Sequence, residues 1–112
     1  MTPIFHPAPS MMLVGCDADL GEECQRAFPG LLVLRVAHAS AGAERMLVTR
    51  PLVVLLGDEI VDKRDEKVVI ECAGDIRAEV IRVAAGPRES LFEQVRAALL
   101  EAERHRGEPT SA

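Results

Sequence analysis

Carboxylates follow two apolar segments of the chain, and this spacing is the feature that could support chemistry. Asp17 follows residues 11–15 (MMLVG), and Asp58 and Glu59 follow residues 52–56 (LVVLL). If both segments are strands of an open parallel α/β sheet, their carboxyl ends form the edge at which such sheets bind ligands. Carboxylate oxygens are the ligands that divalent cations prefer. Asp17 and Asp58 are therefore candidates for a divalent-metal or small-ligand site of an enzyme.

A second interpretation makes the same carboxylates polar turn residues. Asp19 can cap a helix, and Glu22 three residues later completes a capping box. His38 belongs to the same predicted edge, but no Ser, Cys or second His is matched to it as a catalytic partner. The three cysteines have no C-x-x-C spacing and are typical of small buried side chains. This interpretation predicts no catalytic residue, no metal and no cofactor.

Composition narrows the class of protein. The chain has 112 residues, of which 48% are apolar and only 3% aromatic, so we expect one domain with an aliphatic core. The net charge of −5 is unfavourable for nucleic acid, and no apolar run approaches the roughly 20 residues of a membrane span. Residues 1–15 lack the basic segment and cleavage site of a signal peptide. We expect a cytoplasmic protein that binds neither nucleic acid nor membrane.

Hydrophobic periodicity predicts strands that alternate with helices. The predicted strands are residues 11–15, 31–37, 52–56 and 79–84. The helices after the first, second and fourth strands have apolar faces at helical spacing, made by Leu20, Cys24, Ala27 and Phe28, by Ala43, Met46 and Leu47, and by Leu91, Val95, Ala98, Leu99 and Ala102. Ser40 can cap the second helix, which ends before Pro51.

The segment 62–73 fits either kind of element. Its stretch KVVIECA could be a strand, yet one helical face also accommodates its apolar residues Val68, Val69, Cys72 and Ala73 together with Ile76. Gly74 lies where a helix would stop. The alternation of strands and helices favours the helix, and short connections then give one parallel sheet covered on both faces.

Three stretches resemble the receiver domain of response regulators: MLVGCDADLGEECQRAF, ASAGAERMLVTRPLVVLLG and AEVIRVAAGPRESLFEQVRAALLEAE. The resemblance implies a flavodoxin-like fold of bacterial two-component signalling, but this chain is one strand–helix unit short. We therefore expect a (βα)4 three-layer α/β sandwich with a four-stranded parallel sheet in the order 2-1-3-4. The receiver-like domain would span residues 11–104, between an extended arm (1–10) and a flexible tail (105–112).

The chain departs from the receiver motif at each position that carries its chemistry. By this resemblance, Gly15 and Cys16 replace the acidic pair that holds Mg²⁺, and Gly57 replaces the phosphoacceptor aspartate. Ala84 replaces the lysine that pairs with the phosphoryl group. Without these residues nothing binds the metal, attacks the phosphodonor or neutralises the transferred charge. The resemblance thus implies a degenerate pseudo-receiver that is not an enzyme.

A pseudo-receiver would act by contact with other proteins, in signalling or as a scaffold, independently of aspartate phosphorylation. The last predicted strand is an edge of the sheet that is apolar at Val80, Ile81 and Val83, with only Arg82 to discourage pairing, and such edges pair with other chains. Because receivers dimerise through this region, we expect a homodimer whose contacts include Val80, Arg82 and Leu91. The alternative is a monomer whose edge is covered by residues 1–10.

Overall fold

Strands and helices alternate along the chain in a computed structural model that describes residues 9–107. The elements are β1 (Ser10–Val14), α1 (Ala18–Ala27), β2 (Leu32–Val36), α2 (Ala39–Thr49), β3 (Val53–Leu56), α3 (Lys63–Asp75), β4 (Glu79–Arg82) and α4 (Arg88–Gly107). All strand pairs are parallel, and the sheet order is β2-β1-β3-β4. The predicted flavodoxin-like (βα)4 architecture with order 2-1-3-4 is confirmed.

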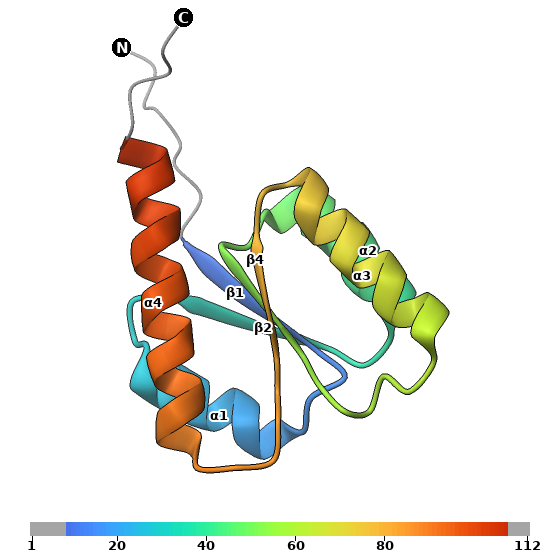
Figure 1. Cartoon of the computed structure of the whole chain (residues 1–112), viewed down its shortest axis with the longest axis horizontal. Coiled ribbons are helices and arrows are strands. Elements are labelled where there is room, and N and C mark those ends of the chain that lie inside the picture. Colours follow the sequence, from blue (N-terminus) through green and yellow to red (C-terminus); the bar gives the residue numbers. More distant parts are fainter. Residues whose placement is uncertain (1–8, 108–112) are drawn as a thin grey trace, which may run out of the picture.

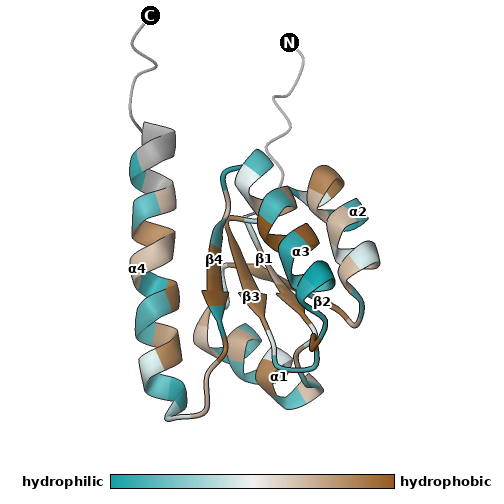
Figure 2. Ribbon diagram, turned by 45° about the vertical axis from the view of Figure 1, so that its right-hand side comes forward, coloured by the Kyte–Doolittle hydropathy of each residue, from teal (hydrophilic) through white to brown (hydrophobic). Residues whose placement is uncertain are grey.

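The sheet lies between two layers of helices, with α1 and α4 on one face and α2 and α3 on the other (Figure 1). Each face has its own aliphatic core. The core under α1 and α4 includes Met11, Leu13, Leu20, Cys24, Leu55, Leu91 and Val95, and the core under α2 and α3 includes Met12, Val14, Met46, Val54, Val69 and Ala73. Strand β3 is hydrophobic along its whole length, whereas the helices mix hydrophilic and hydrophobic residues (Figure 2).

The burial of the central strands explains why they could be predicted from continuous apolar runs in the sequence. Every residue of β1 and β3 is buried, as expected for strands with helices on both faces. The edge strands β2 and β4 are only half-buried. In the register, Val14 lies beside both Val36 and Leu56, and Leu56 lies beside Arg82. The loops after all four strands therefore meet at one edge of the sheet.

The segment 62–73 is helical, and the prediction made from the alternation is confirmed. Asp62 is the N-cap of α3, and its side chain accepts a hydrogen bond from the Arg64 backbone N–H. Val69 and Ala73 are buried as predicted, but Val68 is 41% exposed. The predicted inner face of α2 was likewise one residue too wide, because Leu47 is 60% exposed.

Two predicted helix caps were wrong. The N-cap of α1 is Asp17, whose carboxylate accepts a hydrogen bond from the Leu20 backbone N–H at 2.8 Å, and Asp19 lies in the first turn. The helix therefore begins two residues earlier than a cap at Asp19 requires. At α2 the N-cap is His38, which makes no side-chain capping bond, and Ser40 lies inside the helix.

The predicted limits of the domain differ slightly from the observed elements. The sheet begins at Ser10, whereas the predicted arm was to reach that residue. Helix α4 continues to Gly107, although the tail was predicted to start at 105. The rest of the predicted arm and tail, residues 1–8 and 108–112, lies outside the described residues. Within the part that is described, no helix has the length and apolar character needed to cross a membrane.

Candidate functional site

The loops after β1 and β3 touch each other through their backbones at the carboxyl edge of the sheet. The Gly57 N–H donates to the Val14 carbonyl at 2.8 Å, and the Glu59 N–H donates to the Gly15 carbonyl at 3.2 Å. A Cβ atom on Gly57 would lie 2.1 Å from the Gly15 carbonyl oxygen, far inside van der Waals contact. Position 57 therefore holds no residue other than glycine unless the backbone moves.

Gly15 is restricted on a different ground. Its φ is +68°, a left-handed conformation that residues with a Cβ rarely adopt. A Cβ there would also lie 2.5 Å from Cγ1 of Ile60. Ile60 packs against the core under α2 and α3, so its side chain is held in this place. The space beside the end of β1 is thus filled by an apolar side chain.

Next to this contact is an open cavity of about 370 Å³. The ends of β1, β3 and β4 and the starts of α1 and α4 contribute its lining. The lining residues are Cys16, Asp17, Leu20, Gly57, Asp58, Val83, Ala84, Ala85, Gly86 and Arg88. The structure therefore brings together the two carboxylates that the sequence singled out, Asp17 and Asp58, as well as Cys16, Gly57 and Ala84, three of the four positions that the resemblance to receivers singled out.

The two carboxylates differ in what they already bond. One oxygen of Asp17 is occupied by the cap of α1 described above. Asp58 is exposed and makes no hydrogen bond or ion pair within residues 9–107 that would fix its carboxylate. Among the described residues, no group of three His, Cys, Asp or Glu side chains is placed to hold a metal ion. Asp17 and Asp58 are thus two carboxylates that line the same open cavity.

Cys16 forms the apolar floor of the cavity. It is 4% exposed, and its thiol faces the carbonyl oxygens of Val14 and Leu55 at 3.8 and 3.7 Å. Burial raises the pKa of the Cys16 thiol to about 12, and Cys24 and the nearby carboxylates of Asp17, Glu59 and Asp58 add to this rise. The thiol is therefore protonated at neutral pH and is a poor nucleophile.

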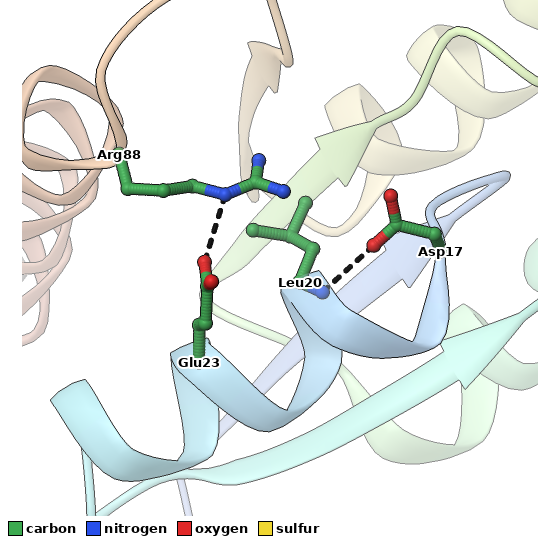
Figure 3. A network of polar contacts seen from close by, with 4 residues as sticks. All are labelled: Asp17, Leu20, Glu23 and Arg88. Atoms are coloured by element: carbon green, nitrogen blue, oxygen red, sulfur yellow. Dashed lines mark hydrogen bonds and ion pairs between the residues drawn. The ribbon is translucent and has the colours of Figure 1, made fainter.

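Arg88 is the cation of the site, and sequence reasoning did not identify it. Its Nε atom lies 2.7 Å from Oε2 of Glu23 on α1, so the ion pair ties the start of α4 to α1 (Figure 3). The guanidinium and Asp17 lie on either side of the Leu20 side chain. The signal available in the sequence was the position of Arg88 directly after Gly86-Pro87, which opens the helix beside the last strand.

The residues predicted to bind a partner lie away from this cavity. Val80 is half-buried against the core under α2 and α3, and Arg82 forms an ion pair with Glu66 of α3. Leu91 is only 7% exposed and belongs to the core under α1 and α4. Leu91 is therefore not part of a surface that a partner could reach, and Val80 and Arg82 remain as edge residues.

No family model matches the chain, and neither a curated protein nor a solved structure matches it. The fold and the geometry of the carboxyl edge are therefore the basis for proposing a function.

Proposed function

We propose that the chain is a non-catalytic, receiver-like domain that works by contact with other proteins, independently of aspartate phosphorylation. The parallel sheet of order 2-1-3-4 agrees with the resemblance to receivers in the sequence. That the chain is related to receivers is itself part of the proposal, because many flavodoxin-like proteins with other activities share this sheet order.

The contact between Gly57 and Gly15 is the observation that supports this proposal most strongly. The resemblance assigns the phosphoacceptor to position 57, where a Cβ would lie 2.1 Å from a backbone oxygen. An aspartate at this position is therefore incompatible with the backbone of the chain. The chain thus differs from receivers in the backbone around position 57 as well as in the residue at that position. Ile60 also fills the space beside Gly15, where the resemblance expects metal-binding carboxylates.

The lysine position supports the same conclusion. Ala84 lines the cavity but carries no charge, so it cannot neutralise a phosphoryl group. Arg88 is a cation of the same cavity, yet its Nε is already engaged by Glu23. Position 57 is a glycine and therefore also lacks a nucleophile. A cation alone does not restore phosphoryl transfer.

The open edge of β4 supports the assignment of protein contact. The Glu79 N–H donates to Leu52 and the Val83 N–H donates to Leu56, so these residues pair inward with β3. Because direction alternates along a strand, the N–H and C=O groups of Val80 and Arg82 point away from the sheet. Unpaired backbone groups at an edge are a template for a strand of another chain.

Affinity capture from the cells that produce the protein tests this proposal. A specific protein partner should be recovered equally with the wild-type chain and with Asp58→Asn, since recognition does not depend on a phosphorylated carboxylate. Arg82→Ala should reduce recovery of that partner, whereas Arg64→Ala, an exposed position on α3, should not. A partner that is lost with Asp58→Asn, or recovered unchanged with Arg82→Ala, would contradict the proposal.

A further inference from the structure

We propose that the cavity at the carboxyl edge of the sheet binds a small zwitterion, that is, a molecule that carries an ammonium and a carboxylate group. This inference does not rest on the proposed protein contacts, because those involve the β4 edge and not the cavity. The cavity of about 370 Å³ is large enough for a ligand of the size of an amino acid.

The positive end of the site is Arg88. The Glu23 carboxylate forms an ion pair with its guanidinium, with Oε2 2.7 Å from Nε, although the two atoms are not aligned as a hydrogen bond. The two terminal nitrogens of Arg88 have no other partner within the described part of the chain, and Figure 3 shows the Leu20 side chain between the guanidinium and Asp17. A planar guanidinium with two free nitrogens matches the geometry of a carboxylate.

The negative end of the site consists of Asp17 and Asp58, which come from different loops. The cap of α1 uses one oxygen of Asp17, and the second oxygen has no partner in the described residues. Asp58 contributes a whole carboxylate. Both carboxylates line the same cavity beside Cys16. An ammonium group is the complement of such a pair of carboxylates.

A ligand with a single charge can pair either with Arg88 or with the two carboxylates, but not with both. An anion bonded to Arg88 would share the cavity with two carboxylates that repel it. A cation between Asp17 and Asp58 would leave the free nitrogens of Arg88 facing it across Leu20. A zwitterion pairs each charge of the wall with an opposite charge. Binding should therefore require both groups of the ligand, whereas either group alone should bind poorly.

Titration with a series of zwitterions tests the proposal on the intact chain. The probes are glycine, β-alanine, γ-aminobutyrate and ε-aminocaproate at about 10 mM, which differ in the distance between their charges. At least one of them should raise the melting temperature and shift the backbone amide resonances of Leu20, Gly57 and Gly86 in a saturable manner. Acetate and methylammonium, each with one of the two charges, should do neither.

Variants assign the binding to the cavity. Arg88→Gln and Asp58→Asn should each weaken the affinity about tenfold or more, because each removes one charged partner of the ligand. Arg64→Gln on α3 keeps the net-charge change of Arg88→Gln but lies on the opposite face of the sheet, and it should bind like the wild type. Melting curves without ligand verify that each variant is folded. If Arg88→Gln does not fold, Asp58→Asn provides the test, since Asp58 is exposed.

Three results would overturn the proposal. The first is that no zwitterion of the series shifts the cavity resonances. The second is that acetate or methylammonium binds as tightly as the best zwitterion, which would make the cavity a simple ion site. The third is that affinity is unchanged in Asp58→Asn or in a folded Arg88→Gln.

Discussion

At the scale of single residues, Gly57 sets what the carboxyl edge of the sheet can do. Its backbone lies so close to Gly15 that Gly57→Ala should cost about 3 kcal/mol or more of unfolding free energy, because two loops joined by hydrogen bonds must separate. Denaturant unfolding measures this cost.

Gly74 provides the matched control for this substitution. It lies in α3, and nothing is within 4 Å of the position that its Cβ would occupy. Gly74→Ala should therefore raise the unfolding free energy by about 0.5–1 kcal/mol, since alanine is the better helix former. Equal, small effects of the two substitutions would show that the loops adapt and that position 57 could carry a side chain.

The thiol of Cys16 predicts how stability changes in alkaline solution. Its pKa rises from the usual 9.0 to about 12 in the folded protein, so between these values the unfolded chain loses the proton and the folded chain keeps it. Stability from this group is complete below pH 9.0 and falls as pH increases toward about 12. The loss should be on the order of 1–2 kcal/mol by about pH 10.5.

Unfolding titrations between pH 8 and about pH 10.5 measure this linkage. The chain contains no tyrosine, so the buried thiols of Cys16 and Cys24 dominate the decline in this window. Cys16→Ala should show a shallower decline than the wild type, although Cys24, whose pKa is also raised by burial, to about 11, still contributes. Identical slopes for the wild type and Cys16→Ala would contradict the burial of this thiol.

Residue types alone located only part of the candidate site. Asp17 and Asp58 could be found because each follows a clear apolar strand, and the structure places both at one cavity. The capping role went to Asp17 rather than Asp19, because helix starts vary by a residue or two without changing the apolar pattern. Arg88 was missed because its role depends on Glu23, which is 65 positions earlier in the sequence and adjacent only in the fold.

At the scale of elements, the helix α3 and the strand β4 show where sequence patterns are sufficient and where they are not. The helical assignment of α3 was correct because strand and helix alternate throughout the chain. The inner faces of α2 and α3 were predicted too wide, with Leu47 and Val68 assigned to the core. Periodicity gives the direction of an apolar face, but the sheet and the neighbouring helix decide how much of it is covered.

The β4 edge also makes the oligomeric state testable. If two chains pair through β4, Val80→Pro should convert a dimer into a monomer, because it removes an N–H that points away from β3. The inward hydrogen bonds from Glu79 and Val83 would be kept. Light scattering at micromolar protein concentration measures the mass.

Strand β2 at the other edge supplies the control for this experiment. The Leu32 N–H donates to Pro9, so by alternation the N–H of Val33 points outward. Val33→Pro should leave the dimer intact. A wild-type chain that stays monomeric as its concentration rises, or a dimer that survives Val80→Pro, would rule out pairing through β4.

At the scale of the whole molecule, the order of the sheet followed from few rules. Two buried central strands, short connections and right-handed crossovers restrict four βα units to few topologies, and the resemblance selected the order 2-1-3-4 among them. These rules do not predict the contact between the loops of Gly15 and Gly57, because that contact depends on backbone positions to within an ångström. The geometry of the site therefore could not be predicted from the sequence.

Incubation with acetyl phosphate and Mg²⁺, followed by intact-mass spectrometry, tests directly whether the carboxyl edge of the sheet accepts a phosphoryl group. We expect an unchanged mass, because Gly57 carries no nucleophile and Ala84 carries no charge to stabilise the transfer. A phosphorylatable receiver treated in parallel verifies the reagents, and Asp58→Asn shows whether any added mass belongs to that carboxylate. A phosphoryl group on wild-type Asp58 that is absent from Asp58→Asn would contradict the proposed non-catalytic role, since the carboxyl edge would then be a working phosphoacceptor site.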